Sequence, residues 1–161
     1  MRKILMAAVA LAAVSATPAM AASPQSATFG VEGTVDYSCG AISGSTLQFS
    51  TLNITATGNL GTNAPQTASQ PTYCNGANST VTVTKTAMTN PIPAAANFTS
   101  TIDFEAVVTA DGTQIPADGV AHKVGAFSGN LVVTAQNLSA AAKPMAGSYS
   151  GSIAVTLTPA L

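Results

Sequence analysis

Charged side chains are scarce in this sequence, which has only five lysines and arginines and six aspartates and glutamates among its 161 residues. So few positive charges leave no basic patch for a nucleic acid or an anionic membrane surface. Threonine, serine, asparagine and alanine take the place of charge along most of the chain. Such a surface suits a protein that works outside the cell or packed into an assembly, and we expect no nucleic-acid partner.

Tryptophan is absent, and there are only three tyrosines and one histidine. So few aromatic rings argue against a carbohydrate-stacking platform. His122, Asp118 and any of the many serines could form a catalytic triad on paper, but the sequence has no G-x-S-x-G nucleophile elbow. We therefore expect His122 to be structural or solvated. The sequence predicts no catalytic residue and no enzyme activity.

Metal and cofactor motifs are also missing. Asp103 and Glu105 share one face of a predicted strand, where they could do acid/base work or bind a cation. Carboxylates at this spacing also occur on the solvent face of a half-buried strand. We favour this second interpretation for Asp103 and Glu105. Residues 111–119 contain two Asp-Gly pairs without the spacing of a calcium loop. No glycine-rich loop leads into a helix, so the sequence predicts no metal site and no cofactor.

A long hydrophobic run occurs only at the start of the sequence. Arg2 and Lys3 precede an apolar run at residues 4–14, and small residues follow at Ala19 and Ala21. This order is typical of a secretory signal peptide, predicted here at residues 1–21. No later stretch has the roughly 20 apolar residues of a membrane-spanning helix. We expect an exported chain with one domain at residues 22–161 and no membrane span.

Cysteine occurs twice, at positions 39 and 74. In an oxidising compartment an even pair predicts one disulfide. Closing a loop of about 35 residues would stabilise the fold by roughly 3–4 kcal/mol in the chain-entropy model. A metal or redox role for Cys39 and Cys74 is less favoured, because the pair lacks C-x-x-C spacing and clustered histidines.

Alternation of apolar and polar residues, rather than a helical period, dominates after residue 26. It predicts short strands within residues 27–39, 45–54, 78–87, 100–113, 120–124, 129–136 and 146–159, and a long connection at residues 58–74. The Asp111-Gly112 pair predicts a tight turn after one of these strands. Short strands separated by turn signals indicate an antiparallel β-sandwich or barrel.

Three features of the sequence carry a resemblance to a known family. The alternating stretch TFGVEGTVDYSC runs directly into the first cysteine, and the short Leu-x-Phe strand TLQFSTL follows it. The second cysteine lies in PTYCNGANSTVTVT, beside another strand. The final stretch, AGSYSGSIAVTLTP, is similar to the G-x-Y-x-x-x-V-x-V-x-V endings of the same family. Together these motifs resemble the chaperone–usher pilins, most closely the archaic kind and the related spore coat U domain.

The resemblance implies an all-β, immunoglobulin-like antiparallel sandwich that lacks its last strand. A donor strand from another protein would complete it by filling a groove beside the C-terminal strand. The implied partners are a periplasmic chaperone, an outer-membrane usher and neighbouring like subunits in a fibre. The candidate residues are Tyr149, Ile153, Val155 and Leu157 for the C-terminal strand and groove, and Phe29, Val31 and Val35 for the donor strand.

These features lead to one functional hypothesis and one alternative. The hypothesis is an exported structural subunit of a surface fibre or coat, similar to a pilus or fimbria, that supports adhesion or biofilm formation. Such a subunit would pass through the periplasm to the cell surface. The alternative is a self-contained secreted β-sandwich that binds a carbohydrate or protein ligand, and a stable monomer with a complete sheet would favour it.

Overall fold

The computed structural model describes residues 25–161, none of which is helical. The expected signal peptide at residues 1–21 lies outside the described residues. The chain divides into two units, Met1–Thr34 and Val35–Leu161. Residues 25–34, the described part of the first unit, are exposed and contain no strand. The strands all belong to the second unit, which we describe by itself.

One layer of the second unit is an antiparallel sheet of four strands. In spatial order these are β1 (Gln66–Cys74), β7 (Phe127–Ser139), β4 (Thr101–Ala110) and β5 (Thr113–Ile115). The predicted turn between β4 and β5 is confirmed, because Ala110 pairs with Thr113 across Asp111 and Gly112. Both turn residues have positive φ, 47° and 78°. This conformation fits the right-handed twist of a hairpin and favours the Asp-Gly sequence.

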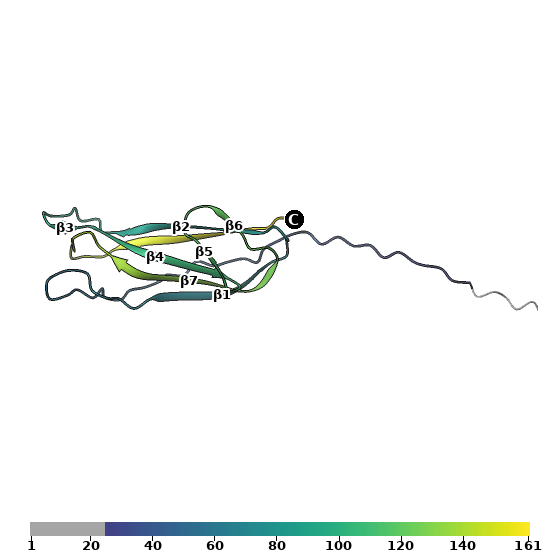
Figure 1. Cartoon of the computed structure of the whole chain (residues 1–161), viewed down its shortest axis with the longest axis horizontal. Helices are drawn as coiled ribbons and strands as arrows, with labels where there is room; N and C mark the ends of the chain where they lie inside the picture. The colour runs from purple at the N-terminus through teal and green to yellow at the C-terminus, as the bar shows by residue number, and fades with distance from the viewer. Residues whose placement is uncertain (1–24) are drawn as a thin grey trace, which may run out of the picture. The chain divides into compact units, whose positions relative to one another are not determined.

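The other layer consists of β6 (Ala121–Lys123), β2 (Thr80–Thr89) and β9 (Ser150–Thr158), again antiparallel. The two layers join where the end of β2 pairs with the start of β4. A short parallel pair, β3 (Phe98–Thr99) and β8 (Lys143–Pro144), lies at the end where β9 begins (Figure 1). The predicted all-β sandwich is therefore confirmed.

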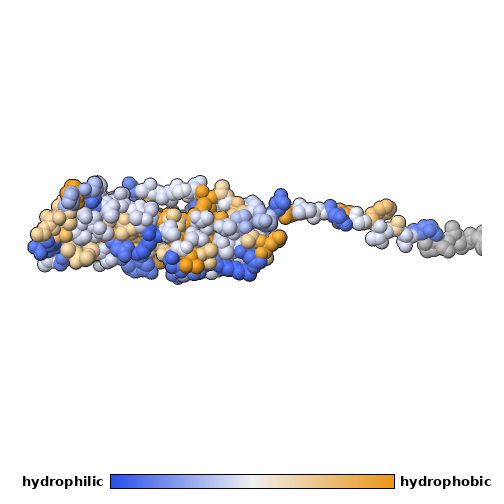
Figure 2. Space-filling view, turned by 90° about the horizontal axis from the view of Figure 1, so that it is seen from above, coloured by the Kyte–Doolittle hydropathy of each residue, from blue (hydrophilic) through white to orange (hydrophobic). Residues whose placement is uncertain are grey.

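The core lies between the two layers and follows from the alternation of side chains along each strand. Val81 and Val83 on β2 are fully buried, while the threonines between and beside them are not. The main cluster consists of Val81, Val83, Val108, Ala110, Ile115 and Leu131. Each large apolar side chain buried in this way contributes about 1.5–3 kcal/mol. On the face shown in Figure 2, strongly hydrophobic residues form separate patches among hydrophilic and neutral ones.

Three predictions about strands were wrong. Residues 27–39 and 45–54 contain no strand, only isolated bridges at Cys39 and Ile54. An alternating pattern does not form a strand without a neighbouring edge to accept its hydrogen bonds. Conversely, the predicted connection at residues 58–74 contains β1. Its inward positions include Gln66, Gln70 and Thr72, so the alternation is not visible as apolar against polar.

Candidate functional site

The last strand, β9, has one unpaired edge. One edge pairs with β2 along nearly its whole length, from Thr158 opposite Thr80 to Ser150 opposite Thr89. No strand in residues 25–161 pairs with the other edge. An unpaired edge presents a row of free N–H and C=O groups, which are a template for another strand.

Across a gap from this edge lies a stretch of chain that we call the wall segment, residues 37–42. It is fastened to β1 rather than to β9. The Gly40 amide donates to the Tyr73 carbonyl at 2.8 Å, and the Asn75 amide donates to the Ser38 carbonyl at 3.1 Å. The predicted disulfide between Cys39 and Cys74 is confirmed and adds a covalent link at the same place.

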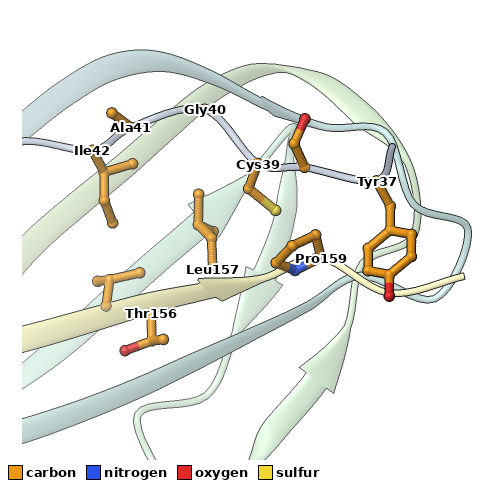
Figure 3. Close-up of a pocket in the computed structure, with 10 residues that line it drawn as sticks. Tyr37, Cys39, Gly40, Ala41, Ile42, Thr156, Leu157 and Pro159 are labelled. Carbon is orange, nitrogen blue, oxygen red and sulfur yellow. The ribbon is translucent and has the colours of Figure 1, made fainter. Parts of the chain in front are cut away.

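The wall segment and β9 enclose an open groove of about 530 Å³. Its lining is the wall segment on one side and Val155, Thr156, Leu157 and Pro159 on the other. Figure 3 shows Leu157 pointing toward the wall segment, whereas Thr156 projects from the opposite side of β9. Tyr37 lies beside Pro159, and Ile42 lies farther along the groove. The wall segment therefore runs antiparallel to β9.

The groove exposes part of the hydrophobic core. Ile153, Val155 and Leu157 pack against the core cluster but are only half-buried, unlike their neighbours Val81 and Val83 on β2. Half-buried apolar side chains next to a free strand edge are what an absent neighbouring strand would leave. Their spacing of two puts these three residues on one face of β9.

Tyr149 lies just before β9 and does not line the groove. Its hydroxyl donates toward the Met145 carbonyl at 2.9 Å and the Thr99 carbonyl at 3.2 Å. A tyrosine that bonds to the backbone a few residues upstream is the tyrosine corner of immunoglobulin-like sandwiches, where it stands near the start of the next-to-last strand. Tyr149 makes a contact of this kind just before β9.

We expect Tyr149→Phe to lower the free energy of unfolding by about 1–3 kcal/mol, because it removes the hydroxyl that donates to the Met145 carbonyl. The Thr99 carbonyl keeps the Met145 amide as a donor. Urea unfolding followed by circular dichroism measures this loss. Tyr73→Phe is the matched control, since the Tyr73 hydroxyl has only a long 3.4 Å contact with Ser38. Equal stability of both variants and the wild type would contradict a corner at Tyr149.

The donor candidates from the sequence are strongly exposed. Phe29 is 85%, Val31 96% and Val35 85% exposed. Phe29 and Val31 belong to the first unit, and Val35 begins the second. Three large apolar side chains at spacings of two and four residues share one face when the segment is extended.

Sequence reasoning missed the wall segment as one side of the groove. Residues 37–39 were assigned to the end of a strand, and residues 40–42 were assigned to no element. The signal that could have located it is the disulfide, because Cys39 must lie beside Cys74.

Among residues 25–161, His122 forms an ion pair with one acidic residue, Asp118. His122 lies beside the Asp118 carboxylate at 3.0 Å, and the Val120 amide also donates to that carboxylate. These two contacts, the amide first, hold the pKa of Asp118 below its ordinary value. Among residues 25–161, no group of three or more histidine, cysteine or acidic residues is arranged to hold a metal. In the same part of the chain no helix is long and apolar enough to cross a membrane.

Asp103 has a structural partner in Lys85, which also contacts the Phe104 ring and carbonyl. The Lys85 ammonium lies 2.9 Å from the Asp103 carboxylate, which also accepts the Phe104 amide. These hydrogen bonds, Lys85 first, lower the pKa of Asp103. Glu105 instead accepts from the side chains of Gln136 and Asn137. Asp103 and Glu105 therefore have separate partners.

The lowered pKa of Asp103 predicts a dependence of stability on pH. The ionised carboxylate is favoured in the folded state, so its contribution is fully present above the unfolded-state pKa of about 3.9. It is lost as the pH falls through the lower folded-state pKa. We expect wild-type stability to fall more steeply than that of Asp103→Asn below about pH 4, measured by urea unfolding at stepped pH. Parallel pH profiles would contradict this expectation.

The fold and the groove define a class of protein: an all-β sandwich with a disulfide-fastened wall segment and an open edge on its last strand. No family model matches the chain, and no curated protein is significantly similar to it.

Proposed function

We propose that this chain is an exported structural subunit of a surface fibre or coat, of the kind formed by chaperone–usher pilins and spore coat U proteins. Each subunit would accept a strand from a partner into its groove and would supply a strand to the next. Assembled in this way, the fibre would support adhesion or biofilm formation at the cell surface.

The observation that carries the proposal is the free edge of β9 beside the half-buried Val155 and Leu157. An added strand would satisfy the backbone groups of that edge and bury the apolar side chains in one step. The tyrosine corner at Tyr149 supports the same interpretation. If β9 is the next-to-last strand of an immunoglobulin-like sandwich, the final strand would stand on the free edge.

The proposal includes a donor and transport partners. Residues 25–36 supply an exposed segment with apolar residues at every second or fourth position, which suits a groove that accepts alternate side chains. A periplasmic chaperone would occupy the groove before assembly, and an outer-membrane usher would exchange it for the donor. Such head-to-tail contacts do not close on themselves and therefore grow into a fibre.

Strand uptake tests the proposal directly. The protein would be expressed without residues 1–34, which removes the donor candidates Phe29 and Val31, and mixed with a labelled peptide of residues 25–36. We expect a stable complex and a rise in melting temperature, because the peptide binds the folded state. A peptide with Phe29→Asp and Val31→Asp is the matched control.

The outcomes separate the two functional hypotheses of the sequence. Uptake of the native peptide and not of its control supports a fibre subunit. A stable monomer that takes up no strand, neither this peptide nor one from a co-expressed chaperone, would contradict the proposal. That result would favour the self-contained sandwich that binds a carbohydrate or protein ligand.

A further inference from the structure

Two loops form one end of the sandwich, which we call the distal end: residues 90–100 and residues 140–149. They are tied together where β3 pairs with β8 and where the Asn90 side chain donates to the Ala146 carbonyl. The buried Asn90 also accepts the Ile92 amide. The two loops of the distal end are therefore held together by hydrogen bonds. Figure 1 shows this end opposite the C-terminus.

The distal end exposes apolar side chains and little charge. Ile92 is 48% and Phe98 43% exposed, and the three alanines at residues 94–96 between them are exposed as well. Lys143 is the one charged residue in the two loops. Exposed apolar residues gathered on one surface are typical of a contact with another protein.

The opposite end, which we call the proximal end, holds the point where the chain enters the sandwich. The Asn75 side chain donates to the Asp36 carbonyl at 2.9 Å, and the Ser38 amide donates to the Asn75 side chain at 2.6 Å. The chain is thus fastened from Asp36 onward. Any donor segment that precedes Asp36 is joined to the proximal end of its own copy with almost no linker.

The free edge of β9 sets the direction of an added strand. β2 pairs with both β6 and β9 in the antiparallel direction, and antiparallel pairing is slightly more stable than parallel pairing. We therefore take the added strand to run antiparallel to β9. The apolar side chains of the added strand must lie on the same face of the sheet as the inward-facing side chains of β9. Val31 of an incoming copy opposite Val155 satisfies this rule. Phe29 then stands opposite Leu157, and Val35 stands opposite Gly151.

This register brings two copies together end to end. With Val35 of the donor at Gly151, its next residue, Asp36, reaches the start of β9, where the distal end of the accepting copy lies. One residue spans only about 3.3 Å, so the two bodies cannot be separated by a free linker. We propose, on the basis of the proposed strand uptake, that the distal end around Ile92 and Phe98 is covered by the proximal end of the next copy.

Cross-linking in the assembled full chain tests this contact. Phe98→Cys would place a thiol at the distal end. Ala77→Cys would place one at the proximal end, in the loop that holds Asp36 through Asn75. A short bismaleimide linker added to fibres carrying both substitutions is expected to give a ladder of covalent multimers. Thr84→Cys with Ala77→Cys is the matched control, because Thr84 is exposed in the middle of β2.

Each outcome decides the contact separately from the proposed function. A ladder from Phe98→Cys and none from Thr84→Cys supports the contact. Fibres that form but give no ladder, or give equal ladders, would overturn the contact while leaving strand uptake in place. If no peptide is taken up and no fibre forms, the proposed function itself fails, and the contact fails with it.

A second variant makes the contact measurable without cross-linking. Phe98→Asp is expected to leave peptide uptake unchanged, because Phe98 does not line the groove. It should weaken association between copies at least about tenfold, as expected for a buried aromatic residue at an interface. Unchanged association of Phe98→Asp, measured by sedimentation, would also overturn the contact.

Discussion

Replacement of Leu157 by aspartate is expected to reduce binding of the donor peptide at least about 30-fold, which corresponds to about 2 kcal/mol. Leu157 points into the groove and is half-buried there (Figure 3). The substitution removes apolar surface that the donor would bury and places a charge where the donor would exclude water. Fluorescence titration of the labelled peptide measures the change.

The neighbouring residue provides the matched control. Thr158→Asp adds the same charge one position away, at an exposed residue of β9 that does not line the groove. We expect its affinity for the peptide to stay within about threefold of the wild type. Melting curves of both variants without peptide separate a binding defect from a folding defect. Equal losses from Leu157→Asp and Thr158→Asp would show that the inward face of β9 is not the binding face.

Replacement of both Cys39 and Cys74 by alanine is expected to lower the free energy of unfolding by about 3–4 kcal/mol. The disulfide closes a loop across 35 residues, and its loss frees that loop in the unfolded state. The wall segment depends on the link more than a paired strand would, because only a few hydrogen bonds join it to β1. We therefore expect peptide uptake to be lost as well.

The measurement compares urea unfolding of the oxidised wild type, the reduced wild type and the double variant. The reduced wild type is the control for side-chain replacement, since it keeps both cysteines and lacks only the bond. We expect it to match the double variant within about 1 kcal/mol. A loss of less than about 1 kcal/mol in both would mean that the wall segment keeps its place without the link.

A strand could be predicted from the sequence where its own residues alternate between apolar and polar, and it was missed where they do not. β2, β4 and β9 each alternate apolar and polar residues, and the sequence located all three. β1 has glutamine and threonine at inward positions, so it was missed. The stretch around Phe29 and Val31 has a clear alternation but forms no strand in the structure, because alternation specifies a face and not a partner.

The sequence by itself determined the strand-rich class of the fold, the disulfide and the shared face of Ile153, Val155 and Leu157. These are local properties, set by side-chain period and by cysteine count. Only the tertiary structure decided which strand edges meet. It left one edge of β9 unpaired, fastened the wall segment to β1 and moved Tyr149 from the groove to a corner. Pairing of edges depends on contacts between residues far apart in the chain, and no local pattern records them.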